Sequence, residues 1–220
     1  MTLFAKRVIK PEKLDHLSPE EARPNLADLV RINSHFGGHS TILKTLARVA
    51  TPEDCFTILD IGAASGDTAR TIGAKYPLAR VVSFDYSETN LGAAPAPKVI
   101  GNAFRLPFAA FSFDYVLCSL FLHHFEDESV VDLLHNFYEL ARRALLVVDL
   151  ERHILPYLFL PVSKPFFGWH HVTVHDGIIS VRASFKCNEL VSLAERAGIL
   201  HCSVEIIRPA FRLAMVAKKG

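Results

Sequence analysis

Residues 58–67 restrict the fold of this 220-residue chain more than any other segment. An apolar run over residues 56–61 carries Asp60 near its end and then breaks into glycine, alanine and serine ahead of Asp67. In this pattern a buried parallel strand delivers a nucleotide-like ligand to the start of a helix. Because the side chains of the turn are very small, ligand atoms can approach its backbone closely. The segment therefore predicts a ligand-binding strand–turn–helix unit.

The spacing of the glycines limits which ligand this turn suits. Gly62 and Gly66 stand four positions apart, with Ala64 where a middle glycine could stand. A dinucleotide fingerprint requires glycine at position 67, where this chain has Asp67, and Asp60 would repel a pyrophosphate. An acid there suits a cationic amino group or a ribose instead. A nicotinamide-dependent oxidoreductase is disfavoured on these grounds, and a turn that merely packs stays an alternative.

The turn resembles motif I, acid-x-G-x-G/A-x-G, of the S-adenosylmethionine (SAM)-dependent methyltransferases with a Rossmann-like sheet. The resemblance implies that SAM is the cofactor and that S-adenosylhomocysteine (SAH) is its product. It also implies that the cofactor contacts the acid and the small residues of the turn, which are Asp60, Gly62, Ala63, Ala64 and Gly66.

The rest of the chain alternates apolar runs with amphipathic segments, which predicts an α/β fold. We expect strands over residues 56–61, 80–84, 98–100, 113–119, 144–150, 202–207 and 211–217, and helices that include residues 129–143 and 188–197. A tight turn joins the last two runs. We therefore predict a doubly wound, Rossmann-like, mostly parallel seven-stranded sheet with an antiparallel C-terminal strand.

The predicted organisation is one domain with two additions. Residues 1–52 read as an N-terminal helical cap, because Ser18 and Glu21 form a capping box around a proline at the first helical position. Residues 53–220 form the SAM-binding methyltransferase domain. Residues 151–185 are unusually long for a connection between sheet elements and are interpreted as a substrate-cap insertion.

The composition excludes some classes of partner. Half of the residues are hydrophobic, the mean hydropathy is +0.23, and the formal net charge is +1 with scattered lysines and arginines. No basic stripe is present to neutralise phosphates, so nucleic acid is not an expected partner. The most apolar stretch, residues 154–169, is too short and too often broken by proline to span a bilayer. The four cysteines read as free buried thiols, and we expect a cytoplasmic protein, monomeric or homodimeric.

Polar or small residues follow each predicted parallel strand at the sheet edge where ligands bind. After the second strand, Asp85 can accept two hydrogen bonds from ribose hydroxyls, although it could instead cap a helix. Asn102 follows the third strand, where the resembling family often carries an aspartate that accepts from the adenine amino group. The cofactor-binding candidates at these ends are Asp85, Tyr86, Asn102, Ala103, Phe104, Ser119 and Leu120.

Two histidines just beyond the fourth strand and an acid at the end of the fifth are the catalytic candidates. His123 and Asp149 could face one another, because their strands are neighbours in the expected order. An aspartate that holds a histidine in one tautomer makes it a better base. Small-molecule O-methyltransferases with a similar Leu-His-His string have such a pair as the proposed base, so the resemblance implies this role for His123, His124 and Asp149. A histidine that only braces the loops is the alternative.

The insertion at 151–185 combines aromatic side chains with a few polar ones, as pockets for apolar acceptors do. Strings at 31–33, 119–124 and 175–182 also resemble bacterial methyltransferases associated with polyketide or quinone-like phenolic products. The substrate-binding candidates are Asn33, Phe121, Tyr157, Trp169, His170, His175 and Arg182. A hydrophobic hairpin docked on the core, or a dimer surface, is the alternative, and no metal site is predicted.

The sequence thus predicts a SAM-dependent methyltransferase that acts on a small apolar acceptor, with an aromatic or polyketide-like hydroxyl as the methylated group. C-methylation of a quinone-like or phenolic ring is the alternative within the class. A SAM-binding subunit without activity and an oxidoreductase remain as alternatives from other classes.

Overall fold

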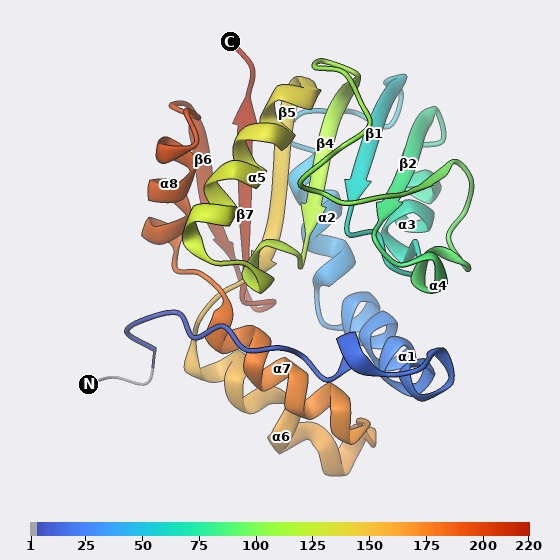
Figure 1. Ribbon diagram of the computed structural model, residues 1–220, viewed down its shortest axis with the longest axis vertical. Helices are drawn as coiled ribbons and strands as arrows, with labels where there is room; N and C mark the ends of the chain where they lie inside the picture. The colour runs from blue at the N-terminus through green and yellow to red at the C-terminus, as the bar shows by residue number, and fades with distance from the viewer. Residues whose placement is uncertain (1–3) are drawn as a thin grey trace.

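The computed structural model describes residues 4–220, and its centre is a seven-stranded sheet (Figure 1). The strand order is β3-β2-β1-β4-β5-β7-β6. The first five strands pair in parallel, while β7 pairs antiparallel with both β5 and β6. The strands are β1 (Phe56–Ile61), β2 (Ala79–Asp85), β3 (Lys98–Ile100), β4 (Phe113–Ser119), β5 (Ala141–Leu150), β6 (Cys202–Ile207) and β7 (Arg212–Lys218). The predicted doubly wound sheet with an antiparallel C-terminal strand is confirmed.

Helices cover both faces of the sheet. In Figure 1, α5 (Asp127–Leu140) and α8 (Cys187–Arg196) lie in front of it, while α2 (Gly38–Leu46) and α3 (Asp67–Lys75) lie behind. Side chains alternate between the two faces along each strand, so Leu59 packs with the α5 and α8 side and Ile58 with the α2 and α3 side. Each such fully buried side chain contributes about 1.5–3 kcal/mol to folding.

The remaining long helices form a cap at the carboxyl ends of the parallel strands. They are α1 (Pro19–His35), α6 (Ile154–Phe167) and α7 (His171–Ala183), and they lie below the sheet in Figure 1. The short elements are η1 (Leu14–His16), α4 (Glu88–Leu91) and η2 (Leu122–His124). The capping box at Ser18 begins α1 as the sequence predicts. The cap thus joins segments from the first 35 residues to segments beyond residue 150.

Three details differ from the sequence-based expectations. The helix expected at 129–143 spans 127–140, and β5 begins at Ala141, because the backbone of that residue pairs with Phe113 of β4. The prolines at 161 and 165 lie inside α6 instead of interrupting the segment. Only Cys118 among the four cysteines is buried; Cys55 is exposed and the other two are partly buried.

No helix in residues 4–220 has the length and apolarity required to cross a membrane.

Candidate active site

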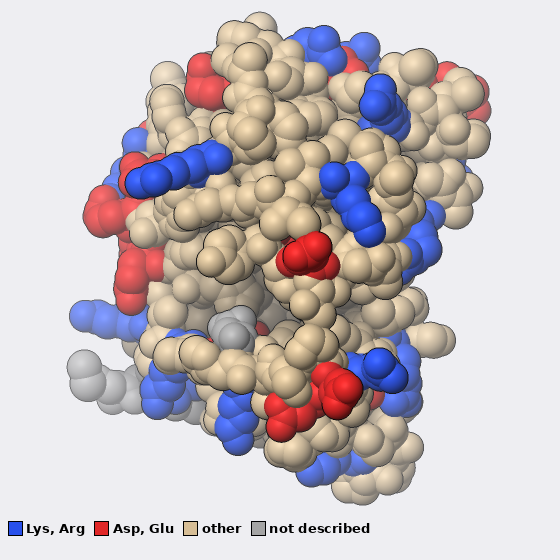
Figure 2. All heavy atoms as spheres, turned by 45° about the vertical axis from the view of Figure 1, so that its right-hand side comes forward, with Lys and Arg blue, Asp and Glu red and all other residues tan. Residues whose placement is uncertain are grey.

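A cavity of about 1530 Å³ lies between the carboxyl ends of the parallel strands and the cap. Figure 2 shows the molecule hollowed between these two parts, with lysines and arginines scattered over this face and not gathered in a stripe. Pockets for one small ligand usually measure about 300–1,000 Å³. The cavity is therefore large enough for a nucleoside-sized ligand together with a second small molecule.

The turn after β1 forms one wall of this cavity, and its backbone requires very small residues. Gly62 has a φ of +75° and Ala64 a φ of +43°, both in the left-handed region. A Cβ atom on Gly62 would lie 2.7 Å from Cδ2 of Phe121. The Gly62 N–H donates to the carbonyl oxygen of Phe84 on β2, which fixes the turn on the neighbouring strand. The turn therefore requires glycine at position 62, where it packs closely against Phe121, and its residues line the cavity.

Asp85, at the end of β2, stands beside this turn. Its Oδ2 accepts from the N–H of Ala64 at 2.9 Å, and its Oδ1 accepts from the N–H of Ser87 at 2.9 Å. A carboxylate has about four acceptor positions, so two of them remain for a ligand. The backbone hydrogen bonds hold the carboxylate in place. Asp85 thus has the loop-capping role, and its ribose role stays a prediction that the remaining acceptor positions allow.

Negative charge collects around the turn. Asp67, the first residue of α3, accepts a hydrogen bond from His39 Nε2 at 2.8 Å and lies 3.5 Å from Asn33 Nδ2. Asp60 is buried, and its Oδ2 has no partner among the described residues. Burial, with the charges of Asp67 and Asp85, raises the pKa of Asp60 well above its ordinary value. The site therefore favours a ligand that brings positive charge or hydrogen-bond donors.

Most of the predicted cofactor residues line the cavity. Asn102 lies in the loop after β3, where its Oδ1 accepts from the N–H of Phe104 at 2.9 Å. Asp60, on β1, and Gly66, just before α3, do not line the cavity. The predicted residues that do line it are Gly62, Ala63, Ala64, Asp85, Tyr86, Asn102, Ala103, Phe104, Ser119 and Leu120.

His123 and Asp149 form a buried pair at the ends of β4 and β5. The Nδ1–H of His123 donates to Oδ1 of Asp149 at 2.7 Å. Burial by itself would lower the pKa of His123, but the carboxylates of Asp149 and Glu12 outweigh it, so the pKa is raised. Burial would likewise raise the pKa of Asp149, and the hydrogen bond and charge of His123 lower it instead. The free protein thus favours an imidazolium–carboxylate pair.

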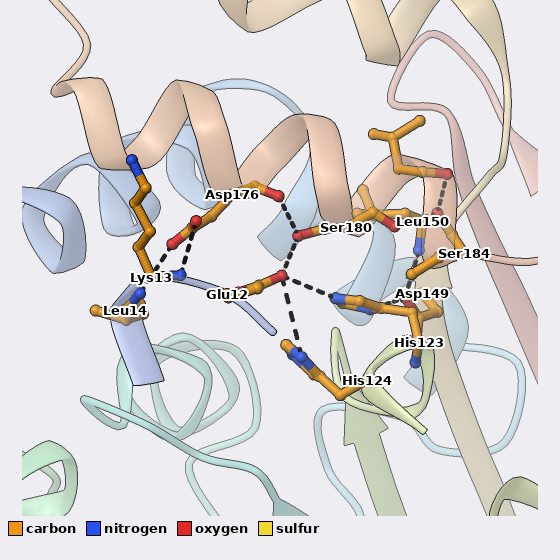
Figure 3. A network of polar contacts seen from close by, with 12 residues as sticks. Glu12, Lys13, Leu14, His123, His124, Asp149, Leu150, Asp176, Ser180 and Ser184 are labelled. Atoms are coloured by element: carbon orange, nitrogen blue, oxygen red, sulfur yellow. Dashed lines mark hydrogen bonds and ion pairs between the residues drawn. The ribbon is translucent and has the colours of Figure 1, made fainter. Parts of the chain in front are cut away.

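Glu12 joins this pair from the N-terminal segment, and no sequence motif pointed to it (Figure 3). Its Oε1 accepts a hydrogen bond from Ser180 of α7 and lies 3.9 Å from Nε2 of His123 and 4.0 Å from Nδ1 of His124. Glu12, His123 and His124 all line the cavity. Within the described part of the chain, Glu12, His123 and His124 also form a group whose ligand atoms lie within 4.8 Å of one another, close enough to share a metal ion.

The N-terminal segment is fixed in place by Arg7. Its guanidinium donates to the carbonyl oxygens of Phe125 and Ala183, at 2.8 and 2.7 Å, and pairs with Asp127. It also lies 4.0 Å from the centre of the Phe185 ring. Because these contacts tie residues 4–13 to η2 and α7, Glu12 has a defined position in the cavity.

Of the predicted substrate residues, only Asn33 and Phe121 line the cavity. Trp169 is buried within the cap, where its ring stacks on Phe167 and contacts Arg31. The N–H of His170 donates to Asp28. The residues placed outside the cavity wall are Tyr157, Trp169, His170, His175 and Arg182. Trp169 and His170 thus join the insertion to α1, a role that the sequence pattern did not distinguish from a pocket.

Comparisons with known proteins agree with this geometry. Residues 59–145 match a family model described as a methyltransferase domain. Human N-acetylserotonin methyltransferase with SAM is 17% identical over 96% of this chain and 60% of its own, with a TM-score of 0.69. The plantazolicin methyltransferase BpumL with SAH is 16% identical over 91% of each chain, with a TM-score of 0.69. A SAM-dependent methyltransferase from Aquifex aeolicus is 12% identical over 92% and 98%, with a TM-score of 0.63. No curated protein sequence matches the chain.

The matched segment and the fold agree: residues 59–145 match a methyltransferase domain, and the chain has the fold of the class I SAM-dependent methyltransferases. The site fits the cofactor of that class, because Asp67 and Asp85 line the cavity beside the turn after β1 and suit a ligand with positive charge and hydroxyl donors. At identities of 12–17% the structural likeness concerns the fold alone. The chain also spans only 60% of the human protein's length, so its reaction and acceptor do not follow from that likeness.

Proposed function

We propose that this chain transfers a methyl group from SAM to a hydroxyl oxygen of a small apolar acceptor of the aromatic or polyketide type. The observation that carries the proposal is that the His123–Asp149 pair and the turn after β1 border one cavity. When bound, SAM supplies an electrophilic methyl group, whose transfer depends mainly on alignment with the acceptor. The chain must therefore orient two molecules and accept one proton.

The loops after β1, β2 and β3 are the proposed cofactor site. Asp85 would accept from the ribose hydroxyls with the acceptor positions that Ala64 and Ser87 leave over. Asn102 would contact the adenine, with Phe104 against the face of the ring. The negative charge of Asp67 and Asp85 would favour the cationic end of the molecule.

His123 is the proposed base. Because Asp149 holds Nδ1–H, Nε2 is the nitrogen left to accept a proton. The acceptor's hydroxyl proton moves to Nε2 as its oxygen gains the methyl group, and the Asp149 carboxylate stabilises the imidazolium. A positioned base of this kind contributes about 10²–10⁴-fold to the rate. Glu12 adds a second negative charge 3.9 Å from Nε2.

The acceptor would occupy the part of the cavity beneath the cap. Leucine, valine and phenylalanine side chains of α1 and α6 line it, which suits an apolar molecule. These wall residues are Leu26, Leu29, Val30, Leu155, Leu158, Phe159, Leu160 and Val162. They come from both cap segments of the sequence. We therefore propose that residues 1–52 and 151–185 act together as a substrate cap on the methyltransferase domain at 53–220.

Two of the similar proteins support a small-molecule acceptor. The human protein is named for N-acetylserotonin, and BpumL has been solved with SAH and a pentazolic desmethyl analogue of plantazolicin, at a TM-score of 0.67. The acceptors of these two proteins serve only as analogies for the acceptor of this chain. A cytoplasmic location and a monomeric or homodimeric state stay predictions from the sequence.

Calorimetric titration with SAH, followed by assays of the purified protein with SAM and a library of phenols and hydroxylated polyketides, tests the proposal. We expect SAH to bind and at least one hydroxylated aromatic compound to gain 14 mass units, roughly one CH₂ group. Chemical demethylation followed by mass spectrometry separates an ether methyl from a ring methyl. Binding of NADH without SAH, or SAH binding without turnover of any acceptor, would contradict the proposed reaction.

A further inference from the structure

Arg212, the first residue of β7, is a buried cation on the wall of the cavity. Its backbone pairs in register with Leu150 of β5 and Ile207 of β6, and the residue is 5% exposed. Its Nε and Nη1 atoms have no hydrogen-bond partner among the described residues. Arg212 lines the cavity, and a guanidinium has five N–H donors, of which those on Nε and Nη1 lie buried without a protein acceptor among the described residues.

Another buried arginine shows how this chain satisfies such a group elsewhere. Arg152 donates to both carboxylate oxygens of Glu189, at 2.8 and 2.5 Å, and to the carbonyl oxygens of Phe4 and Ser184. Among the described residues, Arg212 has no comparable set of hydrogen-bond acceptors. Burial lowers the pKa of Arg212 to about 10, and the charge of Asp149 offsets this only in part. A buried cation left this way is unfavourable unless a bound anion completes its surroundings.

The position of Arg212 indicates that such an anion would bind at the end of the cavity away from the proposed ribose site, where the methyl acceptor would lie. In the sheet order, β7 stands four strands from β2, which carries Asp85. At about 4.8 Å per strand, this places the backbone of Arg212 roughly 19 Å from the proposed ribose site. His123, in η2 after β4, and Asp149, on β5, lie between the two, and the charge of Arg212 interacts with both. The cation is therefore next to the proposed base and not beside the nucleoside.

We propose that Arg212 binds a carboxylate of the methyl acceptor, so that the acceptor is a hydroxylated aromatic or polyketide-like acid. This inference rests on the proposed function, because it concerns the second ligand of the same cavity. The planar donor set of a guanidinium matches the two oxygens of a carboxylate. Such a contact would also anchor the acceptor so that its hydroxyl lies at His123, while the apolar cap residues contact its ring system.

Calorimetric titration of the SAH-loaded protein tests this without turnover. The probes are 3-hydroxy-2-naphthoate and its neutral carboxamide, which differ in charge but hardly in shape. We expect the wild-type protein to bind the carboxylate at least about tenfold more tightly than the amide. R212M should abolish the preference and R212K should keep part of it. The matched control is K44M, which removes another cation from the cavity wall and should leave the preference unchanged.

The outcomes separate this inference from the proposed function. No preference for the carboxylate in the wild-type protein, whether both probes bind equally or neither binds, overturns the assignment of Arg212. Weaker SAH binding by R212M, with naphthoate selectivity retained, overturns it as well, because Arg212 would then serve the cofactor. Failure of the wild-type protein to bind SAH would instead reject the proposed function.

R212M should melt at the same temperature as the wild type or higher, since it removes a buried charge without hydrogen-bond partners at Nε and Nη1. A lower melting temperature with unchanged selectivity would show a structural role and overturn the assignment.

Discussion

The imidazole of His123 donates from Nδ1 to Oδ1 of Asp149 at 2.7 Å, across the carboxyl ends of two neighbouring parallel strands. The N–H of His123 also approaches Oδ2 of Asp149, at 3.3 Å, and the N–H of Leu150 donates to Oδ1 at 2.7 Å. The carboxylate is thus held by backbone N–H groups of η2 and of β5. This relationship leaves Nε2 as the nitrogen that can take a proton from an acceptor.

Replacement of this base should be the most damaging change to turnover. We expect His123→Ala to lower kcat by about 10²–10⁴-fold, because it removes the proposed proton acceptor, and to leave SAH affinity unchanged. His135→Ala serves as the control, since His135 lies on α5 and contacts the carbonyl of Ala197. A near-normal methylation rate in His123→Ala would retire the base assignment.

The pH dependence of turnover should report the pair. His123 must be neutral to accept a proton, and its raised pKa means that kcat should climb with pH through a midpoint above about 6.5. In Asp149→Asn the carboxylate that raises this pKa is absent while burial remains. The midpoint should therefore move to lower pH while the plateau falls by about tenfold or more. Stopped assays across pH 5–9 measure both quantities, and an unchanged midpoint would argue against the pairing.

Glu12 should act on the same ionisation from the N-terminal segment. Glu12→Gln removes a negative charge 3.9 Å from Nε2 of His123, so the midpoint should shift to lower pH by less than in Asp149→Asn. Glu20→Gln, on the exposed first turn of α1, is the control. Treatment with a chelator should leave wild-type activity intact. Activity lost to the chelator and restored by a divalent ion would instead assign Glu12, His123 and His124 as metal ligands.

Cofactor affinity should depend on the charge of Asp85. Asp85→Asn keeps one acceptor for the backbone but loses the charge that strengthens hydrogen bonds from hydroxyl groups, worth about 1.5–3 kcal/mol when intact. We expect SAH binding to weaken about tenfold or more by calorimetry. Asp114→Asn is a matched control, because Asp114 lies near the start of β4, close to Thr57 and Arg143. Equal affinities of the two variants would show that Asp85 only caps its loop.

The turn after β1 should not tolerate a methyl group. Gly62→Ala would place Cβ 2.7 Å from Phe121 in a backbone conformation that disfavours alanine, at a cost of about 1–3 kcal/mol. We expect a lower melting temperature and weaker SAH binding. Gly73→Ala, in α3 with open space around the new Cβ, should instead stabilise the fold by about 0.4–1 kcal/mol. Similar melting curves for the two variants would contradict this account of the turn.

The sequence predicted the sheet well because its signals are local. Apolar runs of three to seven residues gave β1, β3, β4 and β6 with the observed bounds, and the capping box gave the start of α1. The bounds of β2 and β7 differ from the expected ones by one residue at each end. The start of β5 differs by three residues, because Ala141 pairs with Phe113 of β4, which the residues around it do not indicate. Likewise α6 retains two prolines because neighbouring cap helices support it, a feature without a local signal.

The candidate site divides in the same way. The strand order alone brings His123 close to Asp149, and it brings Asp85 close to the turn at Gly62, because parallel strands end at one edge of the sheet. Trp169 and His175 were expected at the acceptor, but the direction in which a cap helix presents its side chains depends on what it packs against. Glu12 precedes His123 by 111 positions and Arg212 follows it by 89, so only the folded chain brings them to the cavity. Contacts between distant segments depend on the packing of the whole molecule, whereas strand and turn patterns are determined by residues that are neighbours in the sequence.

An independent structure with SAH in which the bend after β1 faces packed protein, with the nucleoside elsewhere, would remove the basis for this site.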